Sequence, residues 1–113
     1  MLKIYHNPRC RKSRAGLDYI KQKGSEPEII DYIKSPLSED ELKALLKKLG
    51  KKPKEIVRTQ EELYRKELKG KDLSDARWIK ILAENPRLIQ RPIVETDKKA
   101  VIGNPADIID NLL

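Results

Sequence analysis

Apolar and polar residues alternate from Leu2 to His6, and this period of two predicts a first strand with one buried face. Asn7-Pro8 interrupts the pattern, and apolar residues at helical spacing then predict a helix from about Arg11 to Lys23 that ends at Gly24. Ile29-Ile30 predicts a short second strand. Because a strand, a helix and a strand follow one another within about thirty residues, we expect a right-handed βαβ unit with parallel strands.

The middle of the chain has the signals of several helices. Ser38 opens a capping box, and leucines follow it at i, i+3, i+4 and i+7 spacing up to Gly50. Pro53 is expected to open a short helix, Thr59 is a second possible capping residue, and Ser74 is expected to cap a further helix. Ile56 and Val57 belong to the short helix after Pro53, and Trp78, Ile81 and Leu82 form the apolar stripe of the helix after Ser74. Trp78 and the leucines of these segments are expected in the core, namely Leu42, Leu45, Leu46, Leu49, Leu63, Leu68 and Leu82.

Strand patterns return near the end of the chain. Ile93–Glu95 and Ala100–Ile102 flank a polar segment, which predicts an antiparallel hairpin. Asn104 is expected to cap a last helix, with Pro105 at its first position. The predicted order is therefore βαβ, a helical insertion at about residues 38–86, and ββα. We predict one α/β domain over residues 1–113, with a four-stranded mixed sheet flanked by helices.

Composition limits the classes of function. The chain has 113 residues, a formal charge of +7 and a pI near 9.5, so a nucleic acid, an acidic protein or a small oxyanion could be its partner. Aromatic residues make up only 4%, which argues against a platform for stacked bases. No signal peptide and no membrane-spanning apolar run is visible. We therefore expect a cytosolic, monomeric protein that binds neither nucleic acid nor membrane.

The single cysteine and the single histidine, Cys10 and His6, lie at the turn between the predicted first strand and helix. There, the free N–H groups of the first helical turn, the helix dipole and nearby cations all favour the thiolate, which is the nucleophilic form of the sulfur. A lone cysteine excludes an internal disulfide and a zinc site of several cysteines. Cys10 is therefore a candidate nucleophile or redox sensor, and an inert buried thiol is the alternative.

The order of elements, with a cysteine at the first strand-to-helix turn, is typical of the thioredoxin-like fold. In that fold a cis-proline usually begins the third strand beside the sulfur, and because Pro92 occupies the matching place we expect a cis Arg91-Pro92 bond. Ser13 stands where dithiol oxidoreductases carry a second cysteine, so a redox cycle would need a thiol from outside the chain. The Ser13 hydroxyl could donate a hydrogen bond to the thiolate, although the helix N-terminus alone could serve the same purpose.

Two motifs carry a resemblance that covers nearly the whole chain: Tyr5-His6-Asn7-Pro8-x-Cys10-x-x-Ser13-Arg14 and Leu88-Ile89-x-Arg91-Pro92-Ile93-Val94. They resemble the glutaredoxin-linked arsenate reductase family, whose superfamily also includes the regulator Spx. The resemblance implies that a cysteine thiolate attacks arsenate, that glutathione attacks the thiol–arsenate adduct, and that glutaredoxin completes the release of arsenite. It implies no tightly bound cofactor, with glutathione as the reductant and glutathione and glutaredoxin as partners.

The resemblance also implies roles for single residues. Cys10 would be the nucleophile, and His6 and Ser13 would help to keep it ionised. The residues implied at the substrate are Asn7, Arg14, Arg58, Arg91, Pro92 and Asn104.

One position departs from the pattern of the family. The family surrounds its anion with three arginines, and Arg58 and Arg91 match two of them, whereas Asn104 occupies the place of the third and brings no charge. Arg9 and Arg11, next to the cysteine, could supply the missing charge. Two alternatives therefore remain, a glutathione-dependent thiol reductase of another substrate and a regulator similar to Spx that binds RNA polymerase.

Overall fold

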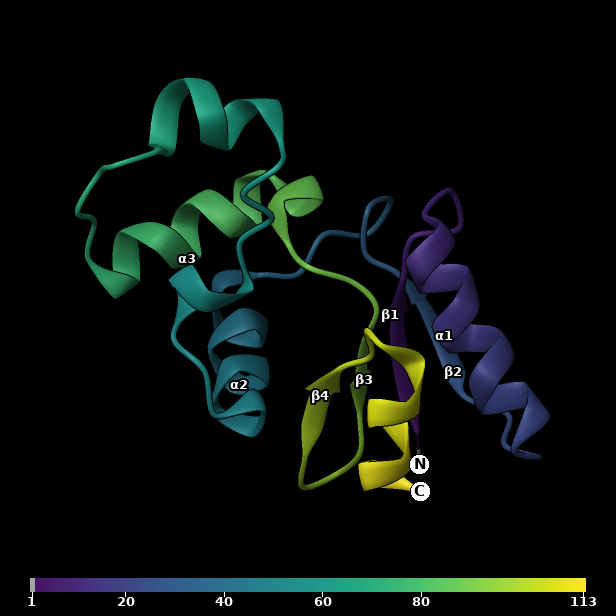
Figure 1. Cartoon of the computed structure of the whole chain (residues 1–113). Helices are drawn as coiled ribbons and strands as arrows, with labels where there is room; N and C mark the ends of the chain where they lie inside the picture. The colour runs from purple at the N-terminus through teal and green to yellow at the C-terminus, as the bar shows by residue number, and fades with distance from the viewer. Residues whose placement is uncertain (1) are drawn as a thin grey trace. The chain divides into compact units, whose positions relative to one another are not determined.

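The computed structural model describes residues 2–113, and the chain divides into two compact units. The first unit contains the residues up to Ser35 and those from Arg91 to Leu113, and the second contains Pro36–Gln90. Figure 1 shows the elements of both units. In chain order they are β1 (Lys3–His6), α1 (Arg11–Gln22), β2 (Glu28–Asp31), α2 (Glu39–Leu49), η1 (Pro53–Ile56), η2 (Tyr64–Leu68), α3 (Asp75–Glu84), η3 (Pro86–Leu88), β3 (Ile93–Glu95), β4 (Ala100–Ile102) and η4 (Ala106–Leu112).

The first unit is built on a four-stranded sheet with the strand order β2-β1-β3-β4. β1 pairs in parallel with β2 and antiparallel with β3, and β3 pairs antiparallel with β4. The strands β3 and β4 have the bounds that the sequence predicts, and β1 begins one residue later, at Lys3. The predicted α/β class and the mixed sheet are therefore confirmed.

One face of this sheet is covered by α1 and by the C-terminal η4 (Figure 1). Ile4 and Val94 from the sheet, Ile20 from α1 and Ile109 from η4 are each 0% exposed and form one cluster. Full burial of one such side chain contributes roughly 1.5 to 3 kcal/mol. The cluster therefore fixes α1 against β1, and with it the turn that joins these two elements.

The last helix differs from the prediction. η4 is a 3-10 helix and its N-cap is Pro105, not Asn104, whose peptide bond to Pro105 is cis. The backbone N–H of Asn104 donates to the carbonyl of Ile102 at 2.9 Å. Asn104 therefore closes the turn after β4 and lies too early in the chain to cap the helix.

The second unit contains α2, η1, η2, α3 and η3. The predicted capping box of α2 is present, because Ser38 Oγ accepts from the Glu41 N–H at 3.1 Å and Glu41 Oε1 accepts from the Ser38 N–H at 3.0 Å. Ser74 caps α3 through a hydrogen bond from the Arg77 N–H at 3.2 Å. The buried apolar side chains of this unit include Leu42, Leu45, Leu46, Ile56, Val57, Leu68, Trp78, Ile79, Leu82, Leu88 and Ile89.

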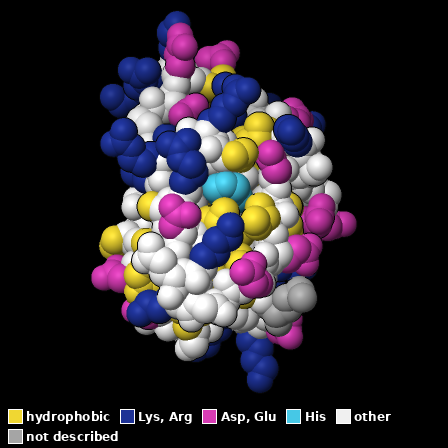
Figure 2. All heavy atoms as spheres, turned by 90° about the vertical axis from the view of Figure 1, so that its right-hand side faces the viewer, with side chains coloured by type: hydrophobic (Ala, Val, Ile, Leu, Met, Phe, Trp, Pro, Cys, Tyr) yellow, Lys and Arg dark blue, Asp and Glu magenta, His cyan; other side chains and the backbone are white. Residues whose placement is uncertain are grey.

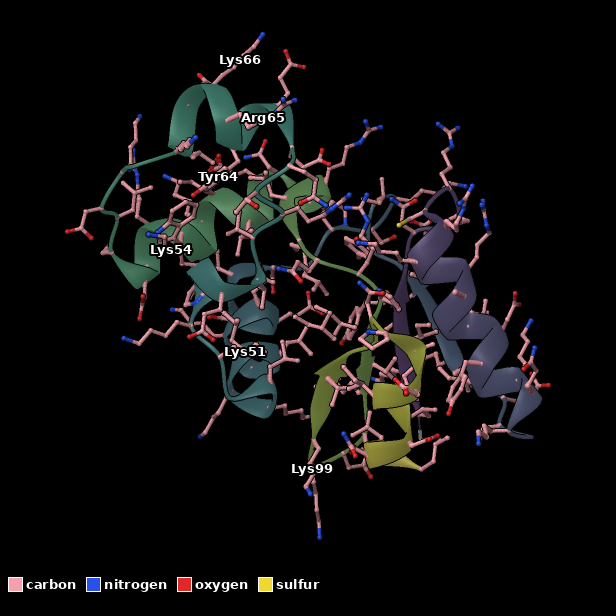
Figure 3. The ribbon with its side chains drawn as sticks, viewed as in Figure 1. Lys51, Lys54, Tyr64, Arg65, Lys66 and Lys99 are labelled. Carbon is pink, nitrogen blue, oxygen red and sulfur yellow. The ribbon has the colours of Figure 1, made fainter. Side chains whose placement is uncertain are left out.

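The capping box predicted at Thr59 is wrong. Thr59 lies in a turn in which the Glu61 N–H donates to the Arg58 carbonyl at 3.2 Å, and the helical turn that follows is the π-helix η2, which has no side-chain cap. The side chains of Arg65 and Lys66 on η2 are exposed, and the Lys66 side chain points outward (Figure 3). Within residues 2–113, no helix is long and apolar enough to cross a membrane.

Candidate active site

The turn between β1 and α1 is held by hydrogen bonds within the turn and from α1. The Asn7 carbonyl accepts from the Cys10 N–H at 3.0 Å, and Asn7 Oδ1 accepts from the Arg9 N–H at 3.1 Å. From the first turn of α1, Arg14 Nη1 donates to the Pro8 carbonyl at 3.1 Å. These hydrogen bonds stabilise the turn, so Asn7 and Arg14 help to fix the position of Cys10 at the start of the helix.

The Cys10 sulfur is half-buried at the N-terminus of α1. Burial raises the pKa of the thiol, but hydrogen bonds from the Ser13 N–H, the Arg91 side chain and the Lys12 N–H lower it, as does the charge of Arg91. Together these effects leave the pKa of Cys10 below its ordinary value of 9.0. More of the sulfur is therefore thiolate at neutral pH than in an unperturbed cysteine.

Ser13 and His6 form a buried polar pair beside this turn. Ser13 is 0% exposed and His6 is 6% exposed, and Ser13 Oγ lies 2.7 Å from His6 Nδ1. Ser13 Oγ also accepts from the Asn7 N–H at 2.9 Å. Part of the imidazole ring is visible at the molecular surface in Figure 2. The Ser13 hydroxyl thus links the histidine to the backbone of the turn, while the Ser13 N–H faces the sulfur.

Burial is the main cause that lowers the pKa of His6, and the charge of Arg14 acts in the same direction. The charges of Asp31 and Asp18 and the hydrogen bond with Ser13 oppose this effect, but the pKa of His6 stays below its ordinary value of 6.5. The imidazole is therefore mostly neutral at pH 7. It acts on the turn as a hydrogen-bonding group and supplies little positive charge to the thiol.

The lowered pKa of His6 predicts a pH-dependent stability. The unfolded chain binds the proton more readily than the folded chain, so the stabilising contribution of neutral His6 is full above pH 6.5 and is lost as the pH falls through the lower, folded pKa. We expect the wild type to lose more unfolding free energy than His6→Gln between about pH 7.5 and 5, measured by urea denaturation. Equal losses in the two proteins would show that His6 does not titrate in this way.

The segment Arg91-Pro92 leads into β3. Its peptide bond is cis, as the sequence predicts, and the Pro92 carbonyl accepts from the Gly103 N–H at 2.8 Å. The Pro92 ring lies close to α1 at Gly16, since a Cβ added to that glycine would lie 2.6 Å from Pro92 Cγ. The sequence prediction did not include Gly16. The available signal was a glycine inside a helical pattern, which usually has a packing reason.

This geometry can be compared with known proteins. The model of the ArsC family matches residues 5–112. The Escherichia coli protein YfgD, whose name states no activity, is 43% identical, and the alignment covers 94% of this chain and 91% of YfgD. An arsenate reductase of Haemophilus influenzae is 41% identical, with 97% of both chains covered. The solved structure of an arsenate reductase from Vibrio cholerae has a TM-score of 0.93 at 38% identity and covers 99% of this chain and 97% of that one.

The chain belongs to the ArsC family. Its first unit contains eight of the nine predicted site residues, which are His6, Asn7, Cys10, Ser13, Arg14, Arg91, Pro92 and Asn104. Asn104 is exposed and lies next to Gly103, whose N–H donates to the Pro92 carbonyl.

Arg58 belongs to the second unit of this ArsC family member. Its N–H donates to the Leu88 carbonyl at 2.7 Å, and its Nη1 lies 3.3 Å from the Glu61 carboxylate, with the Arg58 side chain 17% exposed. The backbone of Arg58 is thus fixed, and its guanidinium already contacts one carboxylate. Its part in binding a substrate remains a prediction.

Proposed function

We propose that this protein reduces arsenate to arsenite through a covalent adduct on Cys10, with glutathione and glutaredoxin as the source of electrons. The observation that carries the proposal is the Cys10 thiol of lowered pKa with the Arg91 guanidinium beside it. Membership of the ArsC family and the arsenate reductases among its relatives support arsenate as the substrate.

The chemistry begins with attack of the Cys10 thiolate on arsenic. An S–As bond forms, and one oxygen of arsenate takes up protons and leaves as water. The glutathione thiol displaces a second oxygen as water, so that arsenic carries two sulfur atoms. A glutaredoxin thiolate then forms a disulfide with the glutathione sulfur, and the electron pair of the glutathione S–As bond passes to arsenic and reduces As(V) to As(III). Hydrolysis of the remaining S–As bond releases arsenite and restores Cys10.

The residues around Cys10 serve different steps of this scheme. Arg91 stabilises the thiolate, and its guanidinium can donate paired hydrogen bonds to a tetrahedral oxyanion, as such groups commonly do. The first-turn N–H groups of Lys12 and Ser13 help to hold the negative charge on the sulfur before attack. Arg58 is proposed as a second cation for the oxyanion.

A coupled assay tests the proposal. Purified protein is supplied with arsenate, glutathione, glutaredoxin, glutathione reductase and NADPH, and NADPH oxidation is followed while one component is omitted at a time. We expect oxidation that depends on arsenate, on the protein and on both thiol partners. Turnover that persists when thioredoxin and its reductase replace glutathione and glutaredoxin would overturn the proposed electron source but not arsenate as substrate.

Asn104 gives a prediction about affinity for arsenate. A hydrogen bond to a charged group is worth about 1.5 to 3 kcal/mol, so we expect Asn104→Arg to lower the KM for arsenate by about tenfold or more. Asn111→Arg places the same charge at another exposed position and is the control. If both variants change KM equally, or if neither variant changes it, the turn at Asn104 does not face the anion.

Asn104 also favours a second candidate function. A site with one guanidinium fewer suits a substrate of lower negative charge, such as a mixed disulfide with glutathione. The same coupled system distinguishes the two candidates when such a disulfide replaces arsenate. A higher kcat/KM for the disulfide than for arsenate would favour this second function.

A further inference from the structure

Gly16 is a buried residue of α1, on the helix face that also carries Ser13. A Cβ built on Gly16 would lie 2.6 Å from Cγ and 3.6 Å from Cβ of Pro92. The first distance is far inside van der Waals contact, so any side chain at Gly16 would force a displacement. The atom it meets belongs to a proline ring, which is closed on the backbone nitrogen. The ring cannot rotate away as a flexible side chain would, so the displacement reaches the main chain at Pro92.

A second glycine encloses the same ring. A Cβ on Gly103 would lie 3.3 Å from Pro92 Cγ and 3.0 Å from Cδ1 of Ile109. The Gly103 N–H donates to the Pro92 carbonyl at 2.8 Å. The Pro92 ring thus packs against the backbone at two glycines, and the closer of the two lies in α1, the helix whose N-cap is Cys10.

We infer that Gly16 is a positioning residue: its missing side chain lets the Pro92 ring seat against α1, and this seat holds Arg91 beside the Cys10 sulfur. The inference rests on the proposed function for the importance of that sulfur. Arg91 directly precedes Pro92, so a shift of the ring carries the Arg91 backbone with it. Cys10 is the N-cap of α1, and Gly16 lies within the same helix, so the sulfur is tied to α1 and does not follow a shift of Pro92. The distance between guanidinium and sulfur must then change, and the thiolate loses part of its stabilisation.

Helix propensity acts in the opposite direction, which makes the inference easy to test. Alanine is a better helix former than glycine, so Gly16→Ala would stabilise α1 if nothing lay against it. A purely local account therefore predicts a higher Tm and an unchanged thiol. If Gly16 instead makes room for the Pro92 ring, Gly16→Ala should destabilise the Cys10 thiolate and raise its titration midpoint, whether Tm rises or falls.

The experiment compares three glycine-to-alanine variants with the wild type. The thiolate of Cys10, the only cysteine, is titrated by its ultraviolet absorbance, and Tm and arsenate reduction are measured on the same samples. Gly16→Ala is expected to raise the titration midpoint and to lower kcat/KM by about a hundredfold, as ångström-scale misplacement can do. Gly103→Ala, with the looser contact to Pro92, is expected to shift the midpoint less in the same direction.

Gly24→Ala is the matched control for lost stability. Gly24 has a φ of 85° and a Cβ there would meet nothing within 4 Å, so alanine strains the backbone without touching Pro92. Its titration midpoint should equal that of the wild type although its Tm falls. If Gly16→Ala does not fold, Gly103→Ala carries the test.

Two results would overturn the inference: a wild-type midpoint in both Gly16→Ala and Gly103→Ala, or an equal rise of the midpoint in Gly24→Ala. A raised midpoint in Gly16→Ala together with a wild type that reduces no arsenate would refute the proposed function and leave the inference standing. A wild-type midpoint in both Gly16→Ala and Gly103→Ala, together with a wild-type protein that reduces arsenate, would refute the inference and leave the proposed function standing.

Discussion

Replacing Cys10 by serine is expected to abolish arsenate reduction, with a loss of at least about 10⁴-fold in kcat. A serine hydroxyl stays protonated at neutral pH, so neither the N–H groups of Lys12 and Ser13 nor Arg91 can turn it into a comparable nucleophile. Because Cys10 is the only cysteine, no other thiol of this chain can take over the attack. The measurement is kcat in the coupled assay with glutathione and glutaredoxin.

Two controls make the Cys10→Ser result decisive. The sulfur is only half-buried and serine is smaller, so urea denaturation should show a free energy of unfolding close to that of the wild type. A mixture without the protein gives the background reduction by glutathione alone. Turnover of the variant clearly above this background would contradict the role of Cys10 as the nucleophile.

Arg91→Ala is expected to lower kcat/KM for arsenate by about 10² to 10³-fold, the usual range for removal of one stabilising donor. Two effects add in this variant. The thiol loses a hydrogen bond and a nearby positive charge, so the pKa of Cys10 rises. The oxyanion also loses its guanidinium partner. The measurements are kcat/KM and the pH dependence of Cys10 alkylation by iodoacetamide.

The pH dependence separates these two effects. At a pH high enough to ionise the thiol in both proteins, the alkylation rates of wild type and Arg91→Ala should converge, whereas the loss in kcat/KM should remain. Arg77→Ala removes an exposed arginine of α3 and is the control for the change in net charge. If Arg91→Ala reacts at the wild-type rate at every pH, the guanidinium does not stabilise the thiolate.

Most of the fold could be predicted from local patterns. The period of two in β1, the capping box at Ser38 and the cap at Ser74 each depend on a few adjacent residues, and each is present in the structure. The two wrong caps, at Thr59 and Asn104, have a common cause. Residues of this kind serve equally well as helix caps and as turn residues, and only their backbone partners decide between the two.

The site residues also fall into two groups, those that neighbouring residues in the sequence place together and those that only the fold brings together. Cys10, Ser13 and His6 come together through a single turn, so the sequence was sufficient to group them. Arg91 could be predicted only through the position of Pro92 in the fold. Gly16 was missed because its importance comes from a contact with Pro92, which is distant in sequence. Arg58 lies in the second unit, and its role remains a prediction.

The central claim is that the Cys10 thiolate forms the covalent adduct through which glutathione and glutaredoxin reduce arsenate. Its most direct test is to incubate the reduced protein with arsenate, glutathione and glutaredoxin and to separate arsenate from arsenite by chromatography. The account predicts arsenite in amounts that grow with the wild-type protein and none above background with Cys10→Ser. Folded wild-type protein with an ionised Cys10 that yields no arsenite would contradict it.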